Sequence, residues 1–480
     1  MKSIGNLCKF AFILFVFAFP ALSGITAPLI RVELSHAPAV SLFCPDEMNI
    51  NLPNGEPIFL GREVSFRSEP GGISINGRLF KTDTLSIHPH GVFELNKHHY
   101  HGSLEVRKAD SDLEIINRLD LEAYLDSVVG SEVSSRWPEE ALKAQAVVAR
   151  TYALEKMDEN KALPFDVVGN YEDQAYDGVE GESSSTRQAV ESTRGEALTY
   201  QGKIITAYYH ADCGGRTEKG ENIFQGPLPY LQSVVCPFAT DSPYRHWTKT
   251  YSLAELSERF GRTIHKIALV KDPESGRVAS VTLETAKSAE SLPAKVFRKL
   301  LGTRDLRSTQ FDATEIDKTV YVPKEESLPP ETITEYVEKE IMQAKKTPLT
   351  LPVPLTDKID LMSRTGGLVE VQVSSANPLV AIASGGFLYT IYQDLSAEGL
   401  KTAMIPETIT VAQVKEGPER KKTVWVPQSV PVGVTFDGRG WGHGVGLCQW
   451  GSRGMALLGK TYHEILHYYY QNVQLEKIYE

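Results

Sequence analysis

The chain has 480 residues, of which 41% are hydrophobic and 23% are charged, with a formal net charge of -11. This length suggests two to four domains and provides ample apolar material for a core. An acidic chain without a basic cluster argues against a nucleic-acid partner and favours a neutral or small substrate.

Residues 1–23 are predicted to form a secretory signal peptide. Two lysines accompany an apolar run from Phe10 to Leu22, and small residues fit a cleavage site before Gly24. The apolar run is short for a membrane-spanning helix. An uncleaved membrane anchor is the alternative interpretation. We therefore expect an exported protein of the periplasm or cell envelope.

Residues 24–107 are predicted to be rich in β-strands. IRVEL, ISINGRL and GSLEV alternate apolar and polar residues, and Asn76-Gly77 predicts a tight turn. Two helices are expected next, in LDLEAYLDSVVGSEV and PEEALKAQAVVARTYALEKM. Beyond them, EALTY and IITAYYH predict strands, and IALVKDPESGRVASVTLE predicts a hairpin around residues 273–276.

Residues 311–433 differ in composition and predict an inserted, mostly-β module. Prolines stand on both sides of an expected short amphipathic helix in SLPPETITEYVEKEIMQAKKTPLTLPVP. LVEVQVSS, LVAIASGGFLYTIY, ETITVAQV and TVWVPQ then alternate as strands. A helix in KTYHEILHYYYQNV, with Thr461 and Glu464 as a capping box, closes the chain. The predicted fold class is α+β, with a core over residues 108–310 and 434–480.

One carboxylate follows an apolar helical stripe. Leu121, Leu125 and Val128 recur at helical spacing, and Glu132 is the next position on that stripe. Burial without a paired cation raises the pKa of a carboxyl group, which suits a general acid. We expect Gly130 to loosen the last helical turn and to bring Glu132 into a cleft. From position alone, an exposed glutamate near a helix end is the simpler interpretation.

The second helix carries small residues on one face and polar residues elsewhere. Gln145 and Tyr152 share a face, and Arg150 lies beside it. Such a helix suits either the positioning of a polar ligand or burial with a polar edge.

The segment GRGWGHGVGLCQWGSRGMA, residues 438–456, has seven glycines among nineteen residues. Glycine in such density predicts that backbone passes close to a neighbouring group.

Three separated motifs occur in one order along the chain: EAYLDSVVGSEVSSRWPEEALKAQAVVARTYAL, AYYHADCGGRTE and GRGWGHGVGLCQWGSRGMA. Together with QAYDG and PYLQSV, they resemble the sporulation stage II protein D family, the SpoIID/LytB domain. The resemblance covers about residues 100–310 and 434–480. It implies action on bacterial cell-wall peptidoglycan. Sporulation members are lytic transglycosylases that cut glycan strands stripped of stem peptides, and LytB-like members enhance a wall amidase.

The resemblance places the catalytic glutamate at Glu132. A lytic transglycosylase needs one carboxyl group, whereas an ordinary glycosidase needs two. Tryptophan faces stack on sugar rings, and amide and imidazole groups bind their hydroxyls. We therefore expect residues 438–456 to form a wall of a glycan groove. The predicted substrate-binding residues are Gln145, Arg150, Tyr152, His210, Arg439, Trp441, His443, Gln449 and Trp450. The alternative is a structural glycine-rich turn with its tryptophans in the core.

Cys44, Cys213, Cys236 and Cys448 remain outside the predicted signal peptide. Export favours a Cys213–Cys236 disulfide as the first interpretation. Zinc bound by His210, Cys213 and Cys236 is the second, since these ligand types suit zinc although their spacing matches no recognised finger. Free thiols are the third, and we expect no catalytic role for Cys448. Apart from that zinc alternative, no cofactor is expected.

Three functional hypotheses follow. The first is a lytic transglycosylase that cleaves the bond between N-acetylmuramic acid and N-acetylglucosamine. The second is a non-catalytic peptidoglycan-binding protein that stimulates a cell-wall amidase. The third is a structural envelope protein that uses the insert for assembly. The expected partners are peptidoglycan strands and, for the second hypothesis, an amidase.

Overall fold

The computed structural model describes residues 26–46, 48–51, 57–329, 332–340, 358–362, 368–372, 379–384, 387–392, 408–416 and 419–480. The predicted signal peptide lies outside these residues. The chain forms two compact units. The first contains the residues up to Asp317 together with Pro431–Glu480, and the second contains Lys318–Val430. None of the helices in the described part has the length and apolar character needed to cross a membrane.

The N-terminal part contains two sheets that share one apolar core, and their strands pair antiparallel except for the parallel pair β13–β1. The first has the strand order β13-β1-β12-β11-β8-β3-β4, and the second β10-β9-β2-β5-β6-β7. Alternating apolar residues put Ile30 and Val32 of β1 into the core, where they are fully buried. The predicted turn at Asn76 and Gly77 joins β6 to β7, and both residues have positive φ angles as such a turn requires. The strand bounds are β1 Leu29–Ala37, β2 Ala39–Phe43, β3 Met48–Asn51, β4 Pro57–Leu60, β5 Glu63–Glu69, β6 Gly72–Ile75, β7 Arg78–Phe80, β8 Thr84–Pro89, β9 Phe93–Leu95, β10 His98–Tyr100, β11 Ser103–Ala109, β12 Asp112–Asp120 and β13 Val167–Val168.

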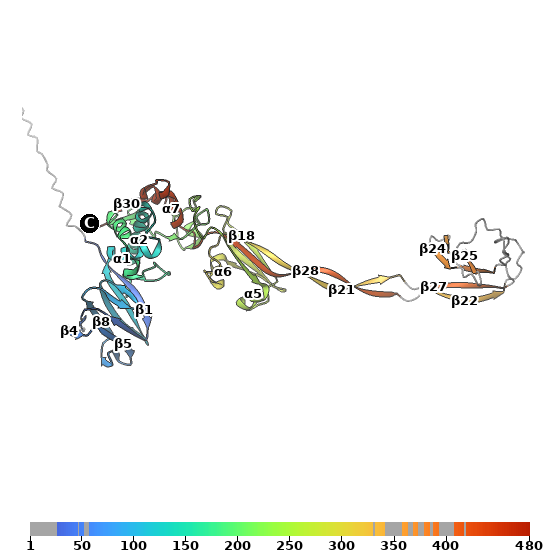
Figure 1. Ribbon diagram of the computed structural model, residues 1–480, viewed down its shortest axis with the longest axis horizontal. Coiled ribbons are helices and arrows are strands. Elements are labelled where there is room, and N and C mark those ends of the chain that lie inside the picture. Colours follow the sequence, from blue (N-terminus) through green and yellow to red (C-terminus); the bar gives the residue numbers. More distant parts are fainter. Residues whose placement is uncertain are drawn as a thin grey trace, which may run out of the picture. The chain divides into compact units, whose positions relative to one another are not determined.

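Helices α1 (Leu121–Glu132) and α2 (Glu139–Glu159) follow directly and confirm the two predicted helices. Asp120 caps α1 by accepting a hydrogen bond from the Glu122 amide at 2.9 Å. Helix α2 separates two cores: Ala146 and Ala149 pack toward the N-terminal sheets, and Ala144 and Val148 toward the C-terminal elements. Figure 1 shows α7 (Gln449–Leu457), from near the end of the chain, close to α2, which it contacts.

The remaining short elements of this core build the surroundings of α2. IITAYYH forms two short strands in different sheets rather than the one predicted, because residues 205–208 between them leave the ladder. The predicted capping box of α8 is confirmed at Thr461 and Glu464. The bounds are η1 Gly178–Gly181, α3 Ser184–Ser192, β14 Glu196–Tyr200, β15 Lys203–Ile204, β16 Tyr209–His210, α4 Gly220–Ile223, β29 Leu447–Cys448, α8 Tyr462–Tyr469 and β30 Gln474–Lys477.

Residues 247–311 and the end of β28 contribute the side chains of a third apolar core. The predicted hairpin forms as β18 and β19, and β17 pairs antiparallel with β28 from Trp247↔Gly438 to Ser252↔Gly433. The bounds are β17 Trp247–Ser252, α5 Leu253–Phe260, β18 Lys266–Lys271, β19 Val278–Glu284, β20 Ala289–Pro293, α6 Ala294–Leu301, β21 Phe311–Leu328 and β28 Arg420–Gly438.

The unit Lys318–Val430 is built from antiparallel strands, and one prediction there is wrong. The segment expected to hold a short amphipathic helix forms strand β22 (Thr332–Glu340), which pairs along its whole length with β27 (Thr408–Glu416). Ile333, Tyr336 and Val337 fit helical spacing, but the β-branched residues of this segment also favour a strand once a partner is present. The other strands are β23 Lys358–Met362, β24 Leu368–Gln372, β25 Leu379–Ser384 and β26 Phe387–Tyr392.

Candidate active site

Glu132 is the last residue of α1 and is half-buried. Its Oε1 accepts hydrogen bonds from the Ala175 backbone N–H at 2.9 Å and from the Tyr209 hydroxyl at 3.1 Å. Its Oε2 accepts one from the Gln449 side-chain amide at 3.2 Å. Three segments that are distant in sequence therefore meet at one carboxyl group.

Burial raises the pKa of the Glu132 carboxyl, although the hydrogen bonds from Ala175, Gln449 and Tyr209 partly oppose this. Among the described residues, Glu132 has no ion-pair partner. A carboxyl group in this environment holds its proton to a higher pH than an exposed glutamate does, as a general acid requires.

The predicted role of Gly130 is wrong. Helix α1 continues unbroken through Gly130 to Glu132. A Cβ atom at position 130 would lie 1.9 Å from the Gly181 carbonyl oxygen, so glycine is needed here because η1 packs directly against the helix.

A chain of hydrogen bonds through buried side chains leads to the Glu132 carboxyl group. The Tyr124 hydroxyl donates to Gln174 Oε1 at 3.2 Å, and Gln174 Nε2 donates to the Tyr209 oxygen at 3.2 Å. Gln174 is fully buried. Tyr209 therefore has its hydrogen directed to Glu132, because its oxygen already accepts from Gln174.

Glu132 opens onto a pocket of about 450 Å³. Trp137 and Trp450 stand in its wall with their rings edge to face, 5.2 Å apart between centroids. The Arg453 guanidinium lies 5.2 Å from the Trp450 ring centroid and pairs with Asp241. The pocket is lined by Glu132, Val133, Ser134, Arg136, Trp137, Ala211, Tyr244, Gln449, Trp450 and Arg453. Aromatic faces with polar edges suit a sugar ligand.

Two predicted substrate-binding residues line this pocket, Gln449 and Trp450. Trp441 is not among the lining residues, but its ring stands edge to face with that of Tyr244, which is, at 4.6 Å between centroids. The side chain of Arg439 is exposed and is not among the lining residues.

The three predicted binding residues of α2 do not line the pocket. Arg150 is fully buried and forms a two-point ion pair with Glu122, at 2.9 and 2.7 Å. The buried ion pair occupies the Arg150 guanidinium and keeps it away from any ligand, so the predicted contact of Arg150 with substrate is wrong. Tyr152 donates to Asp173 at 2.7 Å and thereby holds the segment that carries Ala175. Gln145 is buried, and its side-chain amide has no hydrogen-bond partner among the described residues.

His210 and His443 also lie outside the pocket lining, in contact with each other at 5.5 Å between ring centroids. The Nδ1 of His443 accepts a hydrogen bond from the Val445 amide at 3.1 Å. Burial lowers the pKa of His443 to about 4. His210 is buried, whereas His443 is half-buried beside Tyr208 and Phe224, outside the pocket.

The glycines of residues 438–456 are explained by close packing inside the protein. A Cβ atom at Gly442 would lie 2.7 Å from the Cβ atom of His210, and one at Gly451 would lie 2.5 Å from the Cys236 sulfur. Helix α7 begins at Gln449, so the second half of the segment is not a loop. Of residues 438–456, only Gln449, Trp450 and Arg453 of α7 line the pocket, so the expectation that this whole segment forms a wall of the groove is wrong for residues 438–448.

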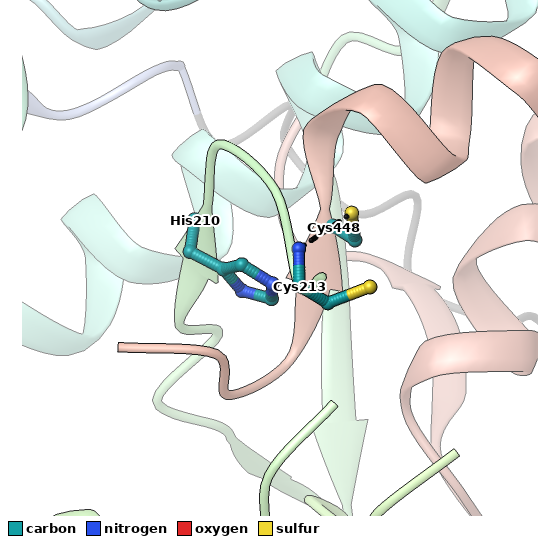
Figure 2. Close-up of side chains that lie close together, drawn as sticks. All are labelled: His210, Cys213 and Cys448. Atoms are coloured by element: carbon teal, nitrogen blue, oxygen red, sulfur yellow. Dashed lines mark hydrogen bonds between the residues drawn. The ribbon is translucent and has the colours of Figure 1, made fainter. Parts of the chain in front are cut away.

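Cys213, Cys236 and Cys448 are buried free thiols, so the predicted Cys213–Cys236 disulfide is not formed. Figure 2 shows His210, Cys213 and Cys448 converging, with their ligand atoms within 4.8 Å of one another. Cys236 adjoins both Cys213 and Cys448, and its sulfur lies 3.1 Å from the Tyr469 oxygen. The cluster is a candidate site for a soft metal ion.

Sequence reasoning missed Tyr209, Gln174, Trp137 and Arg136. Tyr209 stands next to His210, and successive side chains of a strand point in opposite directions, so selecting the histidine pointed to the wrong face. Gln174 lies in QAYDG, a segment noted only for its resemblance.

Comparisons with known proteins match the central part of the chain. The sequence model of the SpoIID family, described as stage II sporulation protein, matches residues 109–200, which include Glu132 and Ala175. An uncharacterized protein of Brachyspira hyodysenteriae is 32% identical over 256 residues, covering 50% of this chain and 68% of that protein.

Two relatives from Bacillus subtilis have descriptive names. Its stage II sporulation protein D is 32% identical over 207 residues, covering 40% of this chain and 58% of the relative. Its amidase enhancer is 25% identical over 356 residues, covering 73% of this chain and 40% of the relative. The chain therefore spans less than two thirds of the length of either Bacillus protein.

Proposed function

This chain belongs to the SpoIID family and has a peptidoglycan-related function, and from that premise we propose that it is a lytic transglycosylase with Glu132 as both acid and base. Its proposed substrate is the glycan strand of cell-wall peptidoglycan. The exported protein would meet this substrate in the periplasm or cell envelope. The bond cleaved joins C1 of N-acetylmuramic acid to O4 of N-acetylglucosamine.

In the first step, the protonated Glu132 donates its proton to the glycosidic oxygen while the bond to C1 breaks. Oε2 is the better position for that proton, because it accepts one hydrogen bond where Oε1 accepts two. In the second step, the Glu132 carboxylate takes the proton of the muramoyl C6 hydroxyl. O6 then bonds to C1, which gives a 1,6-anhydro end and restores the acid without water.

One observation carries this proposal: among the described residues that line the pocket, Glu132 is the single acidic side chain. A hydrolytic glycosidase needs a second carboxyl group within about 5–9.5 Å to bind the sugar or to activate water. Internal attack by the C6 hydroxyl removes that requirement.

The test is mass spectrometry of products released by the purified protein from intact wall and from amidase-treated wall. We expect muropeptides or disaccharides with 1,6-anhydro ends, and we expect Glu132→Gln to abolish them. The matched control is Glu63→Gln, since Glu63 is an exposed glutamate on β5. Release of anhydro products by Glu132→Gln at the wild-type rate would overturn the assignment.

A second candidate function is stimulation of a cell-wall amidase. The match with the protein named amidase enhancer covers 73% of this chain, whereas the sporulation protein match covers 40%. An enhancer would accelerate an added amidase equally well with Glu132→Gln in place. If the purified protein releases no anhydro products and this stimulation survives the substitution, the second function replaces the first.

A further inference from the structure

The Ala175 backbone N–H, which donates to Glu132, has a buried anchor on each side. Gln174 is fully buried, and its side-chain amide is hydrogen-bonded through both its oxygen and its nitrogen. Tyr176 is buried as well, and its hydroxyl lies 2.9 Å from the Asn117 side-chain oxygen. A donor whose neighbours are locked by packing and hydrogen bonds is preorganised for its acceptor. The position of this N–H is therefore set by residues that do not line the pocket.

Asn117 is a fully buried amide in β12, and its partners fix which way it points. Its Nδ2 donates to the carbonyl oxygens of His101 and Ser103, at 2.9 and 3.1 Å. Those two oxygens can only accept, so the amide nitrogen must face them and the amide oxygen must face Tyr176. The Tyr176 hydroxyl is consequently the donor in its bond to Asn117. Asn117 thus ties Tyr176 to the connection between β10 and β11.

Strand β10 holds the next part of the same segment. A Cβ atom at Gly178 would lie 2.0 Å from the His99 carbonyl oxygen, so the two backbones are in direct contact. The Glu180 carboxylate accepts from the His99 backbone N–H at 3.1 Å, and its other oxygen lies 2.6 Å from the His99 Nδ1. Residues 176–180 are therefore fastened to the N-terminal sheets by a buried contact at Tyr176 and an exposed one at Glu180.

The segment also packs on the end of α1, next to Glu132. The Asp177 N–H donates to the Ser131 hydroxyl at 3.2 Å, and Gly181 lies against Gly130. Residues 174–182 are thus held both by the helix that carries the acid and by the strands of the N-terminal part.

We propose that Asn117 and Tyr176 are positioning residues for Glu132: together with β10 they clamp residues 174–182 and so hold the Ala175 N–H on the carboxyl group. This inference rests on the role of Glu132 proposed above, and it assigns the β-rich N-terminal part a share in that role. Strand β10 precedes residues 109–200, which the family model matches, so its contact with the segment lies outside that match.

Loosening the clamp should act on Glu132 in one direction. The hydrogen bond from Ala175 is the largest of the contacts that lower the pKa of Glu132, and Asp177, on the same segment, raises that pKa by a smaller contribution. The other donors and the charged side chains of the pocket lie on other segments: Tyr209, Gln449, Arg136 and Arg453. With weaker donation from Ala175, the acid should therefore hold its proton to a higher pH.

The first test compares Tyr176→Phe with Tyr100→Phe. The first substitution removes only the hydroxyl that reaches Asn117, and the second removes a hydroxyl from the neighbouring ring, 5.6 Å away between centroids. In Tyr176→Phe we expect kcat to fall by about tenfold, inside the range that a misplacement of about an ångström produces. KM should stay unchanged, because neither tyrosine lines the pocket.

The pH–activity profile separates positioning from a merely structural role. Its alkaline limb should move to higher pH in Tyr176→Phe and stay at the wild-type position in Tyr100→Phe. A Tyr176→Phe profile that coincides with the control, or that moves to lower pH, would overturn the proposal.

Glu180→Ala tests the clamp at its exposed end, where a substitution does not endanger folding. The profile should move in the same direction as in Tyr176→Phe but by less, because an exposed ion pair contributes little. Hydrogen exchange of peptides covering residues 174–182 should become faster in both variants. The control is Glu221→Ala, since Glu221 is exposed on α4. Exchange at the wild-type rate in both Tyr176→Phe and Glu180→Ala would show that β10 does not hold the segment.

Direct titration distinguishes this proposal from the proposed reaction. In protein labelled with carbon-13 glutamate, the carboxyl signal that disappears in Glu132→Gln reports Glu132 without any substrate. Its titration midpoint should rise in Tyr176→Phe. A raised midpoint in a protein that releases no anhydro products would refute the reaction and leave the positioning role standing. Release of anhydro products together with an unchanged midpoint would refute the positioning role alone.

Discussion

The Tyr209 hydroxyl donates a hydrogen bond to Oε1 of Glu132 at 3.1 Å, while its own oxygen accepts from Gln174. This bond favours the ionised carboxyl, and burial favours the protonated one. Burial is the larger influence, so the pKa of Glu132 is raised.

Tyr209→Phe should therefore raise the pKa of Glu132 further. The expected result is an alkaline limb of the pH–activity profile displaced to higher pH, with little change in glycan affinity. The control is Tyr208→Phe, since Tyr208 stacks on Phe224 and not on the carboxyl group. A Tyr209→Phe profile that superimposes on the wild-type profile would show that the hydroxyl does not influence Glu132.

Activity should fall as the pH rises through the raised pKa of Glu132, because the first step uses the protonated acid. The same shift predicts a stability effect. A carboxyl group whose pKa is raised by folding destabilises the native state once the pH exceeds its unfolded value, fully so above the folded pKa. Glu132→Gln should thus be more stable than wild type at neutral pH, and this advantage should shrink below the unfolded pKa. Thermal unfolding at pH 7 and pH 4 measures it, and an advantage that grows toward pH 4 would contradict the shift.

Arg150→Met should lower the free energy of unfolding by about 3–5 kcal/mol, because it leaves the buried Glu122 carboxylate without its partner. Adding Glu122→Gln to this variant should recover part of the loss. Urea unfolding measures both. Equal stability of wild type and Arg150→Met would mean that the ion pair is not a structural element.

Trp450→Ala should weaken binding of a peptide-stripped glycan oligomer by about 0.5–1.5 kcal/mol, the range of a single aromatic contact. Trp425→Ala is the matched control, because Trp425 is exposed on β28 in the other unit. Titration calorimetry in the Glu132→Gln background avoids cleavage during the measurement. Equal affinities for the two variants would exclude Trp450 as a binding surface.

The sequence correctly predicted those helices and turns whose signals, such as apolar spacing, capping residues and turn residues, lie within a short stretch of the chain. Helices α1 and α2, the β18–β19 hairpin and the α8 capping box all carry their signals within a few residues. Strand β22 was predicted as a helix because its apolar spacing fits both structures, and its partner β27 lies some seventy positions away.

The site shows the same division. Glu132 and Gln449 were predicted, the first from an apolar stripe and a family motif. Arg150 was assigned to the substrate because nothing near it in sequence reveals that Glu122 takes its guanidinium. Tyr209 was missed because the direction of a two-residue strand is set by its neighbour β29, which comes more than two hundred positions later.

Glu132 and the Gln449 amide that contacts it are 317 positions apart, and the whole unit Lys318–Val430 is translated between them. A ribosome therefore releases the acid long before it releases the amide. Any nascent chain that stops short of Gln449 lacks this donor, so the hydrogen bonding around Glu132 can be completed only after the whole unit Lys318–Val430 has been synthesised.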